Sequence, residues 1–146
     1  MGKELSNWEA MRLNAEERLE TGLILFPIGY YTAVYENAFF AIEIGCKAFM
    51  LKKNPVLIDL RRESDPRHPW FSHDLGKILD QDSPLDRSLR LGCPREYNLL
   101  RSCCRDASIW KPWKRYSYRA DRDIAELYLN LSEGLVKWML TNLLKP

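Results

Sequence analysis

The segment formed by residues 30–53 constrains the fold more than any other part of the sequence. Small and apolar residues recur around most of its circumference at helical spacing, and its charged residues fall in a narrow stripe. Glu43 and Lys47 of this stripe are one helical turn apart, in the order that favours an ion pair. Asn54 and Pro55 end the segment, because the residue before a proline disfavours helical backbone. We therefore predict a long helix near the centre of an all-α fold.

Helix start signals flank this segment on both sides. Ser6 and Glu9 have the spacing of a capping box, which predicts that the first helix starts at Ser6. Residues 54–71 contain three prolines and a run of charges, which indicates a connection. Ser72 is predicted to cap a third helix that ends near residue 80, with Asp74 in its first turn.

The second half of the chain predicts two further helical regions. Residues 84–107 are expected to form the fourth region in two pieces, because Gly92, Cys93 and Pro94 interrupt it. Asp121 is predicted to cap the last helix. The resulting expectation is an up-and-down bundle of about five helices.

Composition limits the class of protein. A chain of 146 residues with 46% hydrophobic and 29% charged residues is expected to form one compact domain, residues 1–146. Charged residues interrupt every apolar run well before the roughly 20 residues that a membrane span needs. The N-terminus lacks a signal-peptide pattern, so a cytoplasmic location is expected. The four cysteines form no CxxC pair and the chain has two histidines, so neither a metal nor another cofactor is expected.

Three stretches of the chain carry a family resemblance through their order and spacing. They are Tyr30-Tyr31 with Ala33, Ala38, Ala41, Glu43 and Lys47-Ala48; His73-Asp74-Leu75 with Leu79; and Lys114-Arg115-Tyr116 with a closing helix that contains Lys137-Trp138. Together they resemble the HEPN family, the small helical bundles named for higher eukaryotes and prokaryotes nucleotide-binding, of the type found beside minimal nucleotidyltransferases. Ser117 stands where the family has proline, and the connection before Ser72 is longer than usual. The resemblance implies a homodimer, with a separately encoded nucleotidyltransferase as partner, and would allow Glu43 with Lys47 to line a cleft.

Catalytic members of the HEPN family are metal-independent ribonucleases, including toxins of toxin–antitoxin pairs, that carry an arginine and then a histidine with four to six residues between them. Arg67 and His73 match that spacing, and His68 is a second titratable group nearby. The resemblance would assign Arg67 to the phosphate and His73 to proton transfer. The match lies earlier in the chain than the family's ribonuclease motif, so the alternative interpretation is that His73 caps or packs at the start of the third helix.

A basic aromatic segment gives a second candidate site. Residues 84–122 contain ten Lys or Arg against four Asp or Glu, and tryptophans and tyrosines alternate with the cations after residue 109. Cations can bind phosphates while rings stack on bases, although the aromatic residues could instead close the bundle and the basic surface could meet an acidic protein. The candidate binding residues are Arg105, Lys111, Trp113, Lys114, Arg115, Tyr116 and Arg119.

The sequence thus leaves two functions open, and only the second is enzymatic. The first is a non-catalytic HEPN-like domain that contacts a nucleotidyltransferase partner, a nucleotide or RNA through the basic aromatic segment. The second is a metal-independent endoribonuclease that uses Arg67 and His73.

Overall fold

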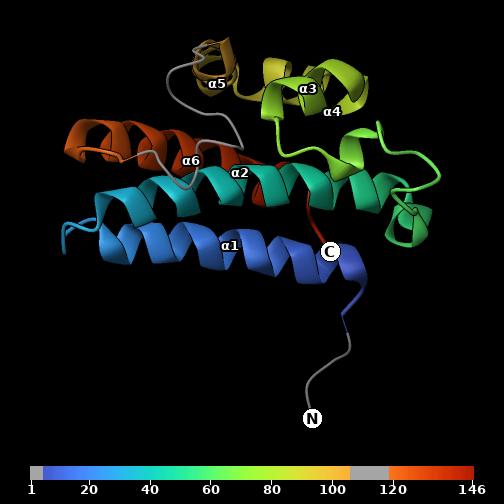
Figure 1. The fold of residues 1–146 in the computed structure, drawn as a ribbon, viewed down its shortest axis with the longest axis horizontal. Helices are drawn as coiled ribbons and strands as arrows, with labels where there is room; N and C mark the ends of the chain where they lie inside the picture. Colours follow the sequence, from blue (N-terminus) through green and yellow to red (C-terminus); the bar gives the residue numbers. More distant parts are fainter. Residues whose placement is uncertain (1–4, 106–118) are drawn as a thin grey trace.

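The computed structural model describes residues 5–105 and 119–146, and within this part the chain forms six α-helices and no strand (Figure 1). The predicted all-α class is confirmed. The helices are α1 (Asn7–Leu25), α2 (Tyr31–Lys53), α3 (Leu75–Gln81), α4 (Ser83–Gly92), α5 (Pro94–Arg105) and α6 (Arg122–Asn142), and two short 3₁₀ turns, η1 (Pro55–Asp59) and η2 (Pro69–Phe71), lie between α2 and α3.

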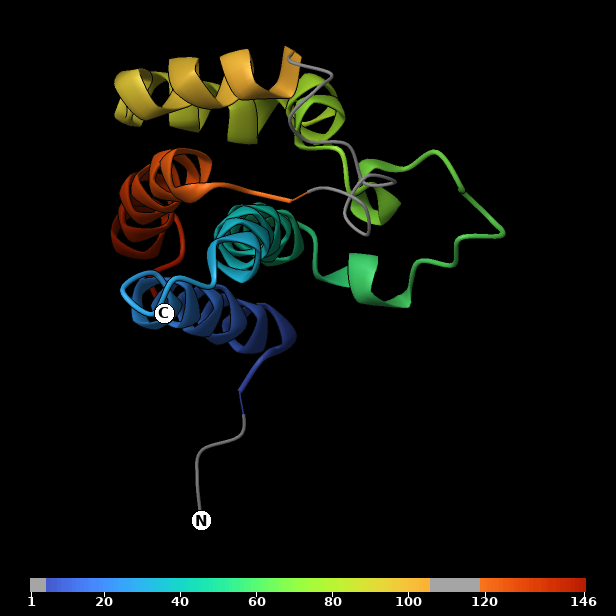
Figure 2. The same cartoon turned by 60° about the vertical axis from the view of Figure 1, so that its left-hand side comes forward.

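The helices lie in three layers. The long helices α2 and α6 form the middle layer, α1 covers one face of it, and the short helices α3, α4 and α5 cover the other (Figures 1 and 2). Buried side chains from all six helices of the described residues belong to one hydrophobic cluster. The short helices therefore share their core with the long ones, and any site between the layers is bounded by both.

Helix directions within the long layers follow from the turns and from contacts at the helix ends. Residues 26–30 turn the chain between the antiparallel helices α1 and α2, and Gly29 adopts a positive φ of 92° there, which other residues rarely adopt. The start of α6 lies beside the start of α2, because the backbone N–H of Ala120 donates to Thr32 Oγ1 (3.2 Å). At the other end, Lys52 Nζ donates to the carbonyl of Leu143 (3.1 Å). The expected up-and-down arrangement thus holds for α1 and α2, whereas α2 and α6 are parallel.

Helix α2 is central, as its apolar circumference predicted. Fourteen of its 23 residues are buried, which requires neighbours on several sides. Tyr35 of α2 packs against Tyr128 of α6 with ring centroids 4.8 Å apart in an edge-on arrangement. Glu43 and Lys47 are the charged residues among the buried ones, and they face the layer of short helices through the contact described below.

The layer of short helices differs from its prediction in one cap and in the helix count. Asp74, not Ser72, caps α3, since its carboxylate accepts the backbone N–H of Lys77 (3.3 Å). The Ser72 hydroxyl instead accepts the N–H of Asp74 (3.0 Å) and positions the cap, so α3 starts later than predicted. The break at Gly92 to Pro94 separates α4 from α5 completely. The described residues therefore contain six α-helices, where about five were predicted.

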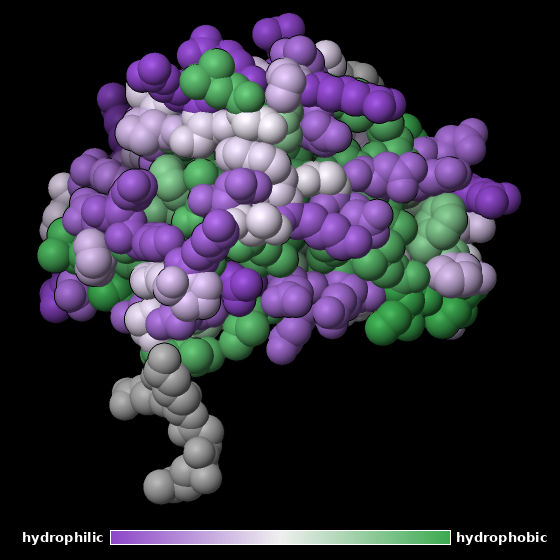
Figure 3. Space-filling view, turned by 180° about the vertical axis from the view of Figure 1, so that it is seen from behind, coloured by the Kyte–Doolittle hydropathy of each residue, from purple (hydrophilic) through white to green (hydrophobic). Residues whose placement is uncertain are grey.

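The start of α1 agrees with its prediction. Ser6 and Glu9 form the expected capping box, and the helix begins at Asn7. Seen from behind, most of the surface is polar, but hydrophobic side chains gather at the end where α1 turns into α2 (Figure 3). Ile24 is 65% exposed and Ile28 is 61% exposed. Across the two described ranges, every helix falls short of the length and apolar character that crossing a lipid bilayer demands.

Candidate functional site

Residues from two pairs that the sequence singled out separately, Lys47 and His73, contact the carboxylate of Glu43. Glu43 Oε2 lies 3.1 Å from Lys47 Nζ and 3.0 Å from His73 Nδ1. The side chains of Glu43 and Lys47 are 5% and 10% exposed, whereas that of His73 is 48% exposed. The contact joins α2 to the residue just before the α3 cap. One edge of the His73 ring is thus held by a buried acid while the rest reaches solvent.

This contact determines which ring nitrogen of His73 carries the proton. An ionised carboxylate only accepts hydrogen bonds, so Nδ1 must donate to Glu43. Lys47 Nζ contacts the same carboxylate oxygen, so this oxygen is also paired with a cation of its own helix. In the neutral ring, Nε2 is then the unprotonated nitrogen. His73 therefore presents a base to solvent, in the way that a buried acid orients a catalytic histidine.

Arg67 and His73 line the same pocket, which we call the histidine pocket. It has a volume of about 340 Å³ and is formed by the residues before α3 and the first turn of that helix. Its lining contains three cations and one carboxylate, and that carboxylate, Asp74, already caps α3. The lining residues are Arg62, Pro66, Arg67, His68, Phe71, Ser72, His73, Asp74 and Lys77. An excess of positive charge makes this pocket suitable for an anion such as phosphate.

The cations of the histidine pocket are available to a ligand. Within the described part of the chain, the side chains of Arg67 and Lys77 have no hydrogen bond or ion pair, and both residues are exposed. The Arg62 guanidinium lies 5.9 Å from the centre of the Phe71 ring, which supports it at the pocket wall. A guanidinium can hold two phosphate oxygens at once, so Arg67 is the best placed group to bind one.

His68, the second histidine of the pocket, is held in the opposite tautomer. Its Nδ1 accepts the backbone N–H of Trp70 (3.1 Å), which opens the η2 turn. The proton of the neutral ring therefore lies on Nε2. His68 is a hydrogen-bond donor where His73 is an acceptor. In their neutral forms, the two rings offer this pocket one hydrogen-bond acceptor and one donor beside its cations.

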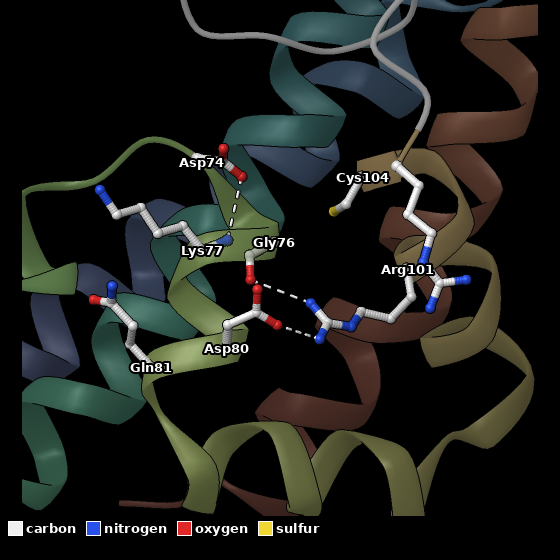
Figure 4. A pocket seen from close by; sticks show the side chains of 8 residues that line it. Asp74, Gly76, Lys77, Asp80, Gln81, Arg101 and Cys104 are labelled. Atoms are coloured by element: carbon white, nitrogen blue, oxygen red, sulfur yellow. Dashed lines mark hydrogen bonds and ion pairs between the residues drawn. The ribbon is translucent and has the colours of Figure 1, made fainter.

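A larger pocket of about 520 Å³ lies between α3 and α5 and shares Asp74 and Lys77 with the histidine pocket (Figure 4). Arg101 of α5 donates to the carbonyl of Gly76 (3.2 Å) and to the Asp80 carboxylate, both on α3. Burial disfavours the charge of Arg101, but the hydrogen bond and charge of Asp80 raise its pKa above the ordinary value. Arg101 is therefore committed to a structural pair, and the carboxylates of Asp74 and Asp80 offset two of the three cations that line this pocket, Lys77, Arg101 and Arg105. The pocket is thus a weaker candidate for binding an anion.

The structure separates the predicted residues of the basic aromatic segment that it describes. Arg105 lines the pocket between α3 and α5, while Arg119 lines another cavity beside Tyr31 and Glu36. Lys111, Trp113, Lys114, Arg115 and Tyr116 lie outside the described residues. The described ends of the segment thus do not share a cavity.

Sequence reasoning missed Arg62 and Lys77, which line the histidine pocket. Lys77 lies four residues after His73, and this i,i+4 spacing in the helix predicted to follow Ser72 could have found it. Arg62 belongs to the charged run of the connection, and nothing in that run distinguishes it from Arg61. Contact between His73 and Glu43 spans thirty residues, and no local pattern predicts it.

The cysteines do not contribute a reactive group to this site. Burial, with the nearby charge of Glu43, raises the pKa of Cys46 far above its ordinary value. Burial and Glu96 raise the pKa of Cys93 to about 11. Both thiols stay protonated near neutral pH, and the thiolate is the nucleophilic form. In the described ranges, His, Cys, Asp and Glu side chains form no group of three that could hold a metal ion.

The resemblance noted in the sequence has no independent support from known proteins. Comparison of the chain with protein-family models, with curated proteins and with solved structures finds no match.

Proposed function

We propose that the histidine pocket is the active site of a metal-independent endoribonuclease, with His73 as the general base. One observation carries this proposal: His73 Nδ1 lies 3.0 Å from the buried Glu43 carboxylate in the pocket that Arg67 also lines. A base fixed in one tautomer beside a free arginine matches what transesterification of RNA needs. The base activates a hydroxyl, and the cation stabilises the charge that develops on the phosphate.

The reaction follows from the position of the His73 lone pair. Nε2 removes the proton of a ribose 2′-hydroxyl, and the 2′-oxygen forms a bond to the adjacent phosphorus. The bond between phosphorus and the 5′-oxygen of the next nucleotide breaks, and that oxygen takes a proton from water. The products are a 2′,3′-cyclic phosphate and a 5′-hydroxyl, and the imidazolium returns its proton to solvent. No oxidant or reductant is needed.

Each neighbour of His73 has a distinct role in this mechanism. Arg67 binds the non-bridging oxygens of the phosphate, and Lys77 and Arg62 add positive charge around it. His68 donates a hydrogen bond from Nε2 to the same phosphate. Glu43 is a positioning residue, because it acts on substrate only through His73, and Lys47 balances its charge.

The sequence resemblance supports the same assignment at the level of family. Under this proposal the chain is a HEPN-type ribonuclease whose arginine and histidine lie before α3, earlier than the family's motif. The Glu43 and His73 positions both belong to stretches that carry the resemblance. Under this proposal, their contact brings residues of both stretches into one active site.

A second candidate is the non-catalytic HEPN-like domain that contacts a nucleotidyltransferase partner, a nucleotide or RNA through the basic aromatic segment. The local excess of six positive charges in residues 84–122 favours it, as does the place of Arg105 at the rim of the pocket between α3 and α5. The exposed Ile24 and Ile28 would suit the homodimer that accompanies this candidate.

Labelled single-stranded RNA incubated with the protein in a chelator distinguishes the two candidates. We expect cleavage into fragments that end in a 2′,3′-cyclic phosphate, and no cleavage of the all-deoxy strand, which lacks the attacking hydroxyl. Salt-sensitive binding with intact RNA would support the binding domain instead and reject the ribonuclease.

A further inference from the structure

Another cavity lies directly beside the histidine pocket, and His68 lines both of them. This side cavity has a volume of about 450 Å³ and lies between the end of α2, the turns η1 and η2, and the start of α4. Phe49, Met50 and Leu57 contribute to its floor, and each is at most 5% exposed. An apolar recess thus lies next to the cationic histidine pocket.

Two free amides lie at the rim of the side cavity. Asn54 and Gln81 both line it, and both are exposed. Neither side chain has a hydrogen bond or ion pair within residues 5–105 and 119–146. Each carboxamide offers one acceptor and two donors. Such a pair can satisfy the mixed donors and acceptors on the edge of a heterocycle, which a lone cation or acid cannot.

We propose that the side cavity binds the nucleobase of the nucleotide whose 3′-phosphate lies in the histidine pocket. A recess of this size with an apolar floor and a few polar groups is typical of a small-molecule site. His68 forms the shared wall, so its ring can stack on the base while its Nε2 faces the phosphate. The inference rests on the proposed function and deepens it, because it makes Asn54 and Gln81 specificity-determining residues for the base on the 5′ side of the cut.

The test compares the affinity of the full chain for three kinds of probe, measured by calorimetry. Inorganic phosphate probes the histidine pocket alone, ribose 5-phosphate adds a sugar without a base, and the four nucleoside 3′-monophosphates add the base. We expect at least one nucleotide to bind about tenfold more tightly than ribose 5-phosphate, which corresponds to one good stacking and hydrogen-bonding contact.

Variants locate that gain in affinity. Asn54→Ala combined with Gln81→Ala should reduce the nucleotide's advantage to less than about threefold while the affinity for inorganic phosphate stays the same. Asn130→Ala is the matched control, because Asn130 lies on α6 outside both cavities and should leave every affinity unchanged. Thermal unfolding of each variant shows whether the fold is retained.

Three outcomes would overturn the inference, and they can be told apart. If inorganic phosphate binds but no nucleotide binds more tightly than ribose 5-phosphate, the side cavity does not bind a base and the ribonuclease proposal stands. If a nucleotide keeps its full advantage in the folded double variant, the base binds elsewhere. If neither phosphate nor nucleotide binds, the histidine pocket is not a phosphate site, and the proposed function fails together with the inference.

Discussion

His73 Nδ1 lies 3.0 Å from Glu43 Oε2, although thirty residues separate them in sequence. Lys47 Nζ contacts the same oxygen. A single buried carboxylate oxygen therefore contacts both a cation of its own helix and a histidine from another segment. Glu43 Oε1 is buried and has no hydrogen-bond partner within the described part of the chain. The contact therefore links the stability of α2 to the orientation of the His73 ring.

Glu43→Ala should destabilise the fold, because it leaves the Lys47 ammonium buried without a partner. Breaking one half of a buried ion pair costs about 3–5 kcal/mol, and we expect the free energy of unfolding in urea to fall by an amount near the lower end. Adding Lys47→Met to Glu43→Ala should recover part of this loss, since the apolar side chain needs no partner. A Glu43→Ala protein as stable as the parent would show that the pair is solvated.

Gly92→Ala should destabilise the fold more than Gly45→Ala. A Cβ atom at Gly92 would overlap Cζ2 of the rigid Trp138 ring, whereas one at Gly45 would meet the flexible Met139 methyl at 2.8 Å. Overpacking of this kind costs about 1–3 kcal/mol, measured by chemical denaturation. Trp138→Leu in the Gly92→Ala background should relieve the clash. If it brings no relief, the cost comes from elsewhere.

Arg101→Lys should weaken the attachment of α5 to α3. The guanidinium donates to both the Gly76 carbonyl and the Asp80 carboxylate, and a lysine ammonium cannot reproduce that fork. We expect the free energy of unfolding to fall by about 1 kcal/mol. The loss is no larger because the Asp80 side chain is 65% exposed, and solvent screens its charge. Arg95→Ala, an exposed arginine on the same helix, is the control. Equal losses for both variants would contradict the role of the fork.

The free energy of unfolding should decrease as pH rises from about 9 to about 11. The unfolded Cys93 thiol loses its proton near pH 9, while burial raises the pKa of the folded thiol to about 11. Between these values the folded state binds more protons, so rising pH favours unfolding. Burial raises the pKa of Cys46 and Tyr128 as well, which adds to the same trend.

Urea titrations across that pH window measure the effect directly. Cys93→Ala should have a shallower dependence on pH than the parent, because one contributing thiol is removed. Stability that is constant across the window would show that the thiols and Tyr128 have ordinary pKa values in the folded state.

The sequence predicted the elements whose signals are local. The apolar circumference of residues 30–53 predicted the central helix, and Asp121 caps α6 as expected, with its carboxylate accepting the N–H of Ile124 (2.9 Å). Gly92, Cys93 and Pro94 marked the break between α4 and α5. Ser72 and Asp74 are two residues apart, and the side chain of either can accept a backbone N–H at the start of a helix. Residue type alone therefore did not show which of them caps α3.

The site was predicted as parts and not as a whole. Glu43 with Lys47 and Arg67 with His73 each follow a local spacing, so the sequence identified both pairs. That His73 reaches the Glu43 carboxylate depends on how the long connection returns to α2, and this connection contains two 3₁₀ turns and the hydrogen bond between His68 and Trp70. Such a path is set by packing between layers, for which the sequence carries no periodic signal.

Cleavage of RNA by His73 and Glu43 variants is the most direct test of the proposed active site. We predict that His73→Asn lowers the turnover rate by at least about 10²-fold, the scale of a lost general base, and that Glu43→Gln lowers it by at least about tenfold through loss of the correct tautomer. Glu36→Gln on the same helix is the matched control and should keep the parent's rate. Affinity for inorganic phosphate should stay within about twofold in all three proteins, since Arg67 is intact. If folded His73→Asn cuts RNA as fast as the parent, or if the parent does not cut RNA at all, the histidine pocket is not a ribonuclease site.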